Sequence, residues 1–253
     1  MDNAKIALVT GGSRGLGRAM ALHLARHRRD IILTYRSAQA EADAVVREIE
    51  GFGRKALALR LDVSDSSTFE AFAKDVAARL AETWQRSHFD FLVNNAGIGI
   101  HAAFLQTTEA QLDELFRIHL KGPFVLTQKL APLIADGGRI LNVSTGLARF
   151  TLPGYAAYAA MKGGVEVLTR YMAKELGARR IGVNTIAPGA IETDFAGGVV
   201  RDNANMNAAI ASQTALGRVG LPDDIGEAVS MLLSDEAHWI SGQRVEVSGG
   251  MFL

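Results

Sequence analysis

The segment Thr10–Gly17 has the sequence TGGSRGLG and separates two stretches of opposite character. Lys5–Thr10 (KIALVT), before it, is short and apolar like a strand, and Gly15–Arg28, after it, has apolar residues at helical spacing. Glycines between a strand and a helix let backbone N–H groups and the helix N-terminus approach a pyrophosphate, although glycine-rich turns that bind nothing are also common. The context predicts a dinucleotide-binding turn whose cofactor contacts are Gly11, Ser13, Arg14, Gly15, Leu16 and Gly17.

The same alternation of strand and helix continues along the chain. Further strands are expected at Asp30–Tyr35, Lys55–Leu61, His88–Val93, Arg139–Ser144, Ile181–Ile186 and Arg244–Val247. Further helices are expected at Ala38–Gly51, Asp65–Arg86, Thr108–Ala135, Tyr155–Ala178 and Pro222–Leu233. Such alternation specifies a parallel sheet with helices on both faces. The predicted fold class is therefore α/β, a Rossmann-type doubly wound parallel sheet of about seven strands, in one domain over residues 1–253.

Composition narrows the possible functions. Of the 253 residues, 48% are hydrophobic and 21% are charged, which indicates a globular protein. Lys plus Arg and Asp plus Glu number 27 each, so the net charge of zero argues against a nucleic-acid partner. The absence of cysteine excludes disulfides and cysteine nucleophiles, makes a metal site unexpected and permits a reducing compartment. No apolar run approaches a membrane span, and the N-terminus enters a strand pattern at once, so we expect a cytoplasmic protein with no membrane partner.

The choice of cofactor follows from the end of the second strand. An NAD site places an acidic side chain there to hold the ribose 2′-hydroxyl, whereas this chain has Thr34-Tyr35-Arg36-Ser37. Arg14 and Arg36 can flank a 2′-phosphate with charge-assisted hydrogen bonds. NADP(H) is therefore expected in preference to NAD(H), with Arg36 and Ser37 as contacts; the alternative is that Arg36 is a solvated surface residue.

A tyrosine and a lysine stand four residues apart in YAAYAAMKGG. Tyr158 and Lys162 share one face of the predicted helix, so both side chains can enter one site. An ammonium beside a phenol depresses the phenol's pKa, and such a tyrosine can give a proton to a carbonyl oxygen that receives a hydride. The spacing also arises by chance. Ser144 and Thr145 follow a predicted strand, where a hydroxyl can polarise a substrate carbonyl or simply satisfy the backbone of a turn.

Together these motifs resemble the short-chain dehydrogenase/reductase family in its single-domain subgroup, and within it the 3-oxoacyl-acyl-carrier-protein reductases. The resemblance covers nearly the whole chain. It implies that Asp62 and Val63 contact the adenine, and that the NNAG segment stabilises the sheet and lines the cofactor. It further implies that a PG-x-x-x-T segment touches the nicotinamide. The residues so assigned to the cofactor are Asp62, Val63, Asn94, Asn95, Ala96, Gly97, Pro188, Gly189, Ile191 and Thr193.

Two positions depart from the family pattern. The family's catalytic hydroxyl stands 13 residues before the tyrosine, a place that Thr145 holds here, with Ser144 as the alternative. His119 occupies a place where the family has an asparagine that helps to hold a water linked to the lysine. A histidine whose pKa lies near neutrality can take part in a proton relay, or it can disturb that water.

The resemblance implies an NADP(H)-dependent oxidoreductase acting on a small-molecule carbonyl or secondary alcohol. Lys162 would bind the nicotinamide ribose and lower the pKa of Tyr158, the proton donor. The alternatives are a cofactor-binding regulator with weak or no turnover, motivated by His119 and Thr145, and another Rossmann-type enzyme. The family also suggests a homotetramer, or a homodimer, with Thr108–Ala135 and Tyr155–Ala178 at one interface.

The stretch Pro188–Leu221 lacks strand periodicity and is long for a loop, which predicts a substrate lid near residues 189–221 or a surface excursion. Apolar residues of the lid and of two neighbouring loops either line the pocket or pack the lid onto the body. They are Phe195, Val199, Val200, Met206 and Ile210 in the lid, and His101, Phe104, Leu147, Phe150 and Leu152 in the loops.

Overall fold

The computed structural model describes residues 4–253 and contains, within them, one sheet of seven parallel strands. The strands are β1 (Ile6–Val9), β2 (Asp30–Tyr35), β3 (Ala56–Arg60), β4 (Phe89–Asn94), β5 (Ile134–Val143), β6 (Gly182–Pro188) and β7 (Arg244–Val247). Their order across the sheet is β3-β2-β1-β4-β5-β6-β7, and every neighbouring pair is parallel. The predicted Rossmann-type fold with seven strands is confirmed.

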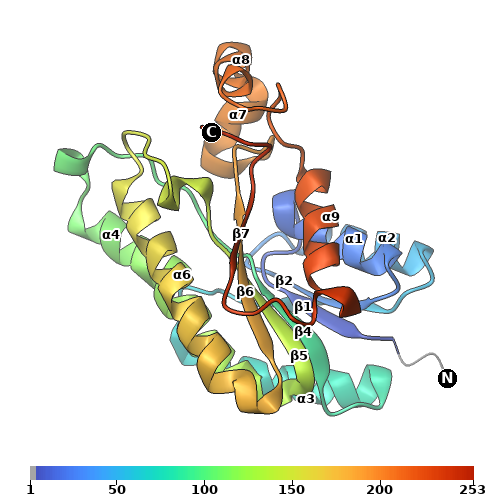
Figure 1. Ribbon diagram of the computed structural model, residues 1–253. Coiled ribbons are helices and arrows are strands. Elements are labelled where there is room, and N and C mark those ends of the chain that lie inside the picture. Colours follow the sequence, from blue (N-terminus) through green and yellow to red (C-terminus); the bar gives the residue numbers. More distant parts are fainter. Residues whose placement is uncertain (1–3) are drawn as a thin grey trace.

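Helices cover both faces of the sheet (Figure 1). The helices are α1 (Gly15–Arg26), α2 (Gln39–Gly51), α3 (Phe69–Trp84), α4 (Glu109–Phe116), α5 (Gly122–Leu130), α6 (Ala156–Leu176), α7 (Val199–Asp202), α8 (Ala204–Ser212) and α9 (Pro222–Leu232). Helices α1, α2 and α9 pack on one face, and α3, α5 and α6 pack on the other. Helices α7 and α8 stand beyond the strand ends at the top of Figure 1, in the segment predicted to be a lid.

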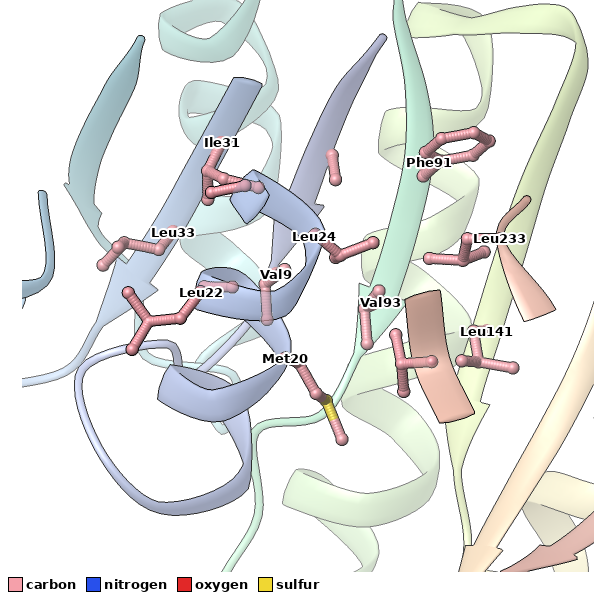
Figure 2. Close-up of a cluster of buried hydrophobic side chains, with 14 of the residues drawn as sticks. Val9, Met20, Leu22, Leu24, Ile31, Leu33, Phe91, Val93, Leu141 and Leu233 are labelled. Carbon is pink, nitrogen blue, oxygen red and sulfur yellow. The ribbon is translucent and has the colours of Figure 1, made fainter. Parts of the chain in front are cut away.

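The strand periodicity of two divides the apolar residues between the two faces. On β1, Ala7 and Val9 point into the core under α1 and α9, whereas Ile6 and Leu8 point into the core under α3 and α5. Figure 2 shows the first of these cores, where Met20 and Leu24 of α1 lie over the sheet. Both faces of each central strand are therefore buried, as a parallel sheet requires.

The strand order reverses direction between β1 and β4. From β1 the chain moves outward to β2 and β3, and it then crosses back to β4 on the other side of β1. The connections that leave β1 and β4 at their carboxyl ends therefore diverge to opposite sides and leave a crevice between them. The turn Thr10–Gly17 and the NNAG segment stand at this point, so the topology brings the two motifs together.

The predicted helix Thr108–Ala135 is wrong as one continuous element. It divides into α4, a π-helical turn at Arg117–Lys121, α5 and a 3₁₀ turn at Ala131–Leu133. Within the π-helical turn, the N–H of Gly122 bonds to the carbonyl of Arg117, five residues back. Pro123 follows and has no N–H to donate, so the regular ladder of helix hydrogen bonds is interrupted there.

The start of β5 and the secondary structure of the lid also differ from the sequence prediction. Strand β5 begins at Ile134, five residues before the predicted start, because Gly137 with a positive φ of 79° and a register shift between Phe89 and Phe91 let the strand extend through Gly137-Gly138. The lid, expected to be irregular, contains α7 and α8.

None of the helices within residues 4–253 combines the length and the apolar character that crossing a membrane would require.

Candidate active site

A cavity of about 570 Å³ opens at the carboxyl ends of the strands, at the point where the strand order reverses. Its walls come from the turn after β1, from the segments after β2, β3, β4, β5 and β6, and from the first half of α6. The start of the lid, Asp194–Gly197, borders it as well. A cavity of this size in this place is where a doubly wound sheet binds its ligand.

The glycine turn forms one end of the cavity. Gly11 has a positive φ of 68°, which a side chain disfavours, and a Cβ atom on Gly17 would lie 2.1 Å from the carbonyl oxygen of Gly11. The turn can therefore close this tightly only with glycine at both positions. Arg14 precedes α1 with extended backbone, and no side chain of the described residues caps that helix by a hydrogen bond. The first N–H groups of α1 are left free to bind an anion such as a pyrophosphate.

The NNAG segment locks the end of β4 against the glycine turn. The Thr10 hydroxyl accepts hydrogen bonds from the backbone N–H groups of Asn95 (2.9 Å) and Ala96 (3.0 Å). The Asn95 side-chain amide donates to the Thr10 carbonyl at 2.8 Å. These bonds fix the two sides of the crevice relative to each other, so the shape of this part of the cavity is preformed.

Two arginines stand at the same end of the cavity. Arg14 and Arg36 are both exposed and both line it. Asp62 lies nearby: burial acts to raise the pKa of its carboxyl, but hydrogen bonds from Ser64 and the charges of Arg36 and Arg60 hold that pKa below its ordinary value. The glycine cradle, the uncapped helix and the two guanidinium groups together fit a dinucleotide with an added 2′-phosphate.

The structure brings the sequence-predicted cofactor residues together in this cavity, with one exception. Those that line it are Gly11, Ser13, Arg14, Gly15, Leu16, Gly17, Arg36, Ser37, Asp62, Val63, Asn95, Ala96, Gly97, Tyr158, Lys162, Pro188, Gly189, Ile191 and Thr193. Asn94 is not among the lining residues. Its side-chain amide donates to Asn142 Oδ1 (2.8 Å) and Thr127 Oγ1 (3.0 Å) inside the fold, so Asn94 ties β4 to its neighbours.

Tyr158 and Lys162 lie together on the opposite wall. Both side chains line the cavity, and their residues are 6% and 5% exposed. The Lys162 ammonium is 5.8 Å from the centre of the Tyr158 ring, and it donates a hydrogen bond to the Val143 carbonyl at 2.7 Å. The spacing of four residues does place a phenol and an ammonium on one face of α6, above the carboxyl end of β5.

The expected depression of the Tyr158 pKa by Lys162 is absent. Burial raises the pKa of Tyr158 above its ordinary value, and a side-chain hydrogen bond from Thr145 opposes this. The ammonium has turned to the Val143 carbonyl, and burial lowers the pKa of Lys162 itself to about 8. Desolvation is therefore the dominant influence on both pKa values in this arrangement.

His119 is buried in the π-helical turn, 1% exposed, with its ring edge-to-face against Tyr158 at 5.1 Å. Its Nε2 atom lies 2.8 Å from the Ile98 carbonyl oxygen and 3.3 Å from the Ile98 N–H nitrogen, and the shorter of the two contacts favours a proton on Nε2. Nδ1 has no hydrogen-bond partner within residues 4–253. Burial, and secondarily the charge of Lys162, lower the pKa of His119 to about 2. A pKa near neutrality, the ground for expecting a proton relay, does not hold, and the ring is neutral at pH 7.

The two neighbouring hydroxyls after β5 point to different partners. The Ser144 hydroxyl donates to Glu166 Oε1 at 2.6 Å. The Thr145 hydroxyl accepts from the N–H of Leu147 at 3.2 Å. Of the two candidates, Thr145 is the one whose hydroxyl opposes the rise in the pKa of Tyr158.

Of the apolar residues expected either to line the pocket or to pack the lid onto the body, only Phe195 lines the cavity. Phe195 packs against the Tyr158 ring, with 5.6 Å between the ring centres. The other apolar candidates in the lid and in the two loops lie outside the lining, and Phe104 is 77% exposed. Tertiary contacts position such loops, so the sequence of the loops alone did not reveal which of their residues face the cavity.

Sequence reasoning missed some cavity residues. Ile98 and Gly99 line the cavity, and the Ile98 carbonyl fixes the orientation of His119. Thr34 also lines it, and its hydroxyl accepts a hydrogen bond from the Gly11 N–H at 3.1 Å. Their positions immediately after NNAG and at the end of β2 were the available signal, since such positions face the crevice of an open α/β sheet.

Comparison with known proteins agrees with this geometry. A family model described as enoyl-(acyl carrier protein) reductase matches residues 11–252. The 3-oxoacyl-[acyl-carrier-protein] reductase FabG of Staphylococcus aureus is 36% identical over 255 residues, covering 100% of both chains. The solved structure of the promiscuous reductase LugOII, which catalyses keto-reduction at C1 during lugdunomycin biosynthesis, is 37% identical, with a TM-score of 0.93 and 98% of each chain covered.

A second solved structure carries a cofactor. The angucycline C-6 ketoreductase LanV with bound NADP is 31% identical, with a TM-score of 0.92, and the match covers 98% of this chain and 95% of LanV. These matches extend over nearly the whole length of both partners, and they include the glycine turn, the NNAG segment and the pair on α6. The chain belongs to the short-chain dehydrogenase/reductase family of oxidoreductases.

Proposed function

We propose that this protein is an NADP(H)-dependent oxidoreductase that transfers a hydride between nicotinamide and a carbonyl or secondary-alcohol substrate, with Tyr158 as the general acid and base. One observation carries the proposal. Tyr158 and Lys162 share a face of α6 and line the same cavity as the glycine turn and the uncapped N-terminus of α1. A dinucleotide held by that turn would therefore have its reactive end beside the phenol.

Different residues along the cavity would hold different parts of the dinucleotide. Gly11–Gly17 and the first turn of α1 would hold the pyrophosphate, and Asp62 and Val63 would face the adenine. Arg14 and Arg36 would hold a 2′-phosphate, which supports NADP(H) over NAD(H). The bound NADP of LanV adds support from a relative. Pro188, Gly189, Ile191 and Thr193 would lie at the nicotinamide end.

The proposed proton transfer uses the buried wall. The bound nicotinamide supplies or accepts the hydride. Burial holds the Tyr158 phenol in its protonated form at neutral pH, which is the form that a proton donor to a ketone oxygen needs. Thr145 lines the same cavity as the phenol and would share the same substrate oxygen. Lys162, with a pKa of about 8, is mostly charged at pH 7 and would orient the nicotinamide ribose.

The experiment is NADPH oxidation by the purified protein against a panel of ketones and 3-oxoacyl thioesters, with NADPH binding followed by fluorescence. Binding together with turnover of at least one carbonyl compound is the expected result. Tight NADPH binding without turnover on any member would favour the alternative of a cofactor-binding regulator. Failure to bind NADPH and NADH would contradict both readings of the site.

The assembly and the compartment stay predictions. A homotetramer, or a homodimer, is supported by exposed apolar side chains on the helices expected at the interface. They are Leu112 and Phe116 on α4, Phe124 on α5, and Val167 and Tyr171 on α6. Light scattering of the purified protein tests this, and a monomer would contradict it. A cytoplasmic location is consistent with the absence of cysteine.

A further inference from the structure

A guanidinium group lies behind the two hydroxyls that follow β5. Arg244, on β7, donates through Nε to Glu166 Oε1 (2.7 Å) and through Nη1 to Glu246 Oε2 (2.9 Å). Its Nη2 donates to the backbone carbonyl of Thr145 at 3.1 Å. One planar group therefore joins α6, β7 and the segment after β5, and its fixed fork of donors holds all three in one geometry.

The same carboxylate controls the neighbouring hydroxyl. Glu166 follows Lys162 by four residues on α6, and its Oε1 accepts from Arg244 and also from the Ser144 hydroxyl at 2.6 Å. Ser144 and Thr145 are thus held from the same side, one through its side chain and the other through its carbonyl. With both contacts in place, the backbone that carries the Thr145 side chain has little freedom to move.

Arg149 adds further hydrogen bonds to this network of Arg244, Glu166 and Glu246. Arg149 donates two hydrogen bonds to the Glu246 carboxylate, at 2.6 and 2.7 Å, and a third to the Met251 carbonyl at 2.8 Å. Two arginines and two glutamates balance in charge, and the side chains of Arg244, Glu166 and Glu246 are at most 23% exposed. Ion pairs in such partial burial are screened less by salt than surface pairs are.

We propose that Arg244 is a positioning residue of the active site, which acts by holding the Thr145 carbonyl and so keeps the Thr145 hydroxyl in place in the cavity that Tyr158 also lines. Glu166 completes the arrangement by accepting the hydrogen bond of the Ser144 hydroxyl. Arg244 lies outside the cavity lining, so its effect on the reaction passes through Thr145. This inference rests on the proposed function, because it concerns the hydroxyl assigned there to the substrate oxygen.

The chain offers a closely matched control. Arg86 pairs with Asp90 at 2.9 Å, with side-chain exposures of 24% and 15%, against 23% and 15% for Arg244 and Glu166. Arg86 also donates to a backbone carbonyl, that of Ala4, at 3.1 Å. Asp90 lies at the amino end of β4, at the opposite end of the strands from the cavity. Loss of either arginine removes a similar set of contacts, but loss of Arg244 alone reaches the Thr145 carbonyl.

The experiment compares Arg244→Met with Arg86→Met for kcat, for NADPH affinity by fluorescence and for thermal unfolding. Arg244→Met should lower kcat by about tenfold, because a small misplacement of a catalytic group has effects of this order, and should leave NADPH affinity within about twofold. Arg86→Met should lower the unfolding temperature to a similar extent and leave kcat within about twofold of the wild type. If both variants lower kcat equally, the effect of Arg244 is general destabilisation and the inference is wrong.

A double-mutant cycle separates positioning from any other role. In a Thr145→Ala background there is no hydroxyl to position, so adding Arg244→Met should change kcat by less than about twofold. Full multiplication of the two losses would overturn the inference. If Arg244→Met does not fold, Arg244→Lys replaces it, because a single ammonium cannot serve the Glu166 carboxylate and the Thr145 carbonyl with the same geometry; the same two outcomes then apply.

The outcome also separates this inference from the proposed function. A wild-type protein that oxidises NADPH with a ketone, beside an Arg244→Met variant of equal kcat, overturns the positioning role alone. A wild-type protein that binds NADPH and turns over no carbonyl compound overturns the proposed function and the positioning role together.

Discussion

The two walls of the cavity differ in the groups they present and in how far those groups are exposed to water. The cofactor wall, comprising Gly11–Gly17 with the segments after β2 and β3, consists of backbone N–H groups and exposed arginines. The wall to which the proposal assigns catalysis, here called the catalytic wall, comprises His119, Thr145, Tyr158 and Lys162, residues that are at most 9% exposed. In the proposed function, the first wall acts through charges that stay in water. The second wall carries buried groups whose pKa values are set by their removal from water, and there the structure changes the pKa values that the sequence implied.

The sharpest test of the catalytic wall is Tyr158→Phe. Removal of the phenol should lower kcat by about a thousandfold, the range for loss of a general acid, and should leave NADPH affinity nearly unchanged. Tyr155→Phe is the control, since Tyr155 stands three residues earlier, contacts the His101 ring and lies outside the cavity lining. Steady-state kinetics and fluorescence titration measure both. A Tyr158→Phe variant with a tenth of wild-type activity would end the assignment of the phenol as proton donor.

The pH dependence of stability at His119 tests whether water is excluded from the catalytic wall. The pKa of folded His119 is about 2, against about 6.5 in an unfolded chain, so between these values the unfolded state binds more protons. Stability therefore falls as the pH decreases below about 6.5. Between pH 6 and pH 4.5, the wild type should lose about 2 kcal/mol of unfolding free energy more than His119→Asn does. Urea unfolding at the two pH values checks this, and parallel losses in both proteins would mean that water reaches the ring.

The two hydroxyls sharpen the comparison within the catalytic wall. Thr145→Ala should lower kcat by about a hundredfold, as loss of a donor to a developing oxyanion does. Ser144→Ala removes a hydrogen bond to Glu166, so it should cost about 1 kcal/mol of stability and change kcat by less than about threefold. Kinetics and thermal unfolding of both variants give the answer. A larger loss of kcat in Ser144→Ala than in Thr145→Ala would assign the catalytic role to Ser144.

The cofactor wall should give the smallest and most selective effect. Arg36→Asp should weaken NADPH binding by about tenfold to a hundredfold, the worth of charge-assisted hydrogen bonds to a phosphate, and NADH binding by less than about threefold. The exposed Arg60→Asp, near the same Asp62 but outside the cavity lining, should change neither affinity by more than about twofold. Fluorescence titration with both cofactors measures this. Equal weakening of the two would show that Arg36 does not face a 2′-phosphate.

The fold was predictable because local patterns and global topology agree. Each strand of the parallel sheet is a short apolar run, and the helices follow at regular intervals, so periodicity alone located all seven strands. The interruption of the predicted helix at Arg117–Lys121 was missed, because it depends on one proline and on the hydrogen bond that spans five residues before it. Asn94 could not be told apart from Asn95, Ala96 and Gly97 by sequence: these three line the cavity, whereas the Asn94 side chain bonds to Asn142 across the sheet.

The sequence by itself determined the fold class, the glycine turn and the pairing of Tyr158 with Lys162, because these depend on spacing along one strand–turn–helix unit or one helix face. Only the tertiary structure decided which hydroxyl affects the pKa of the phenol, that His119 is neutral, and that Arg244 lies behind Thr145. Each of these depends on residues far apart in the chain and on how much water their packing excludes. Spacing carries no information about that exclusion, and a pKa responds to it directly.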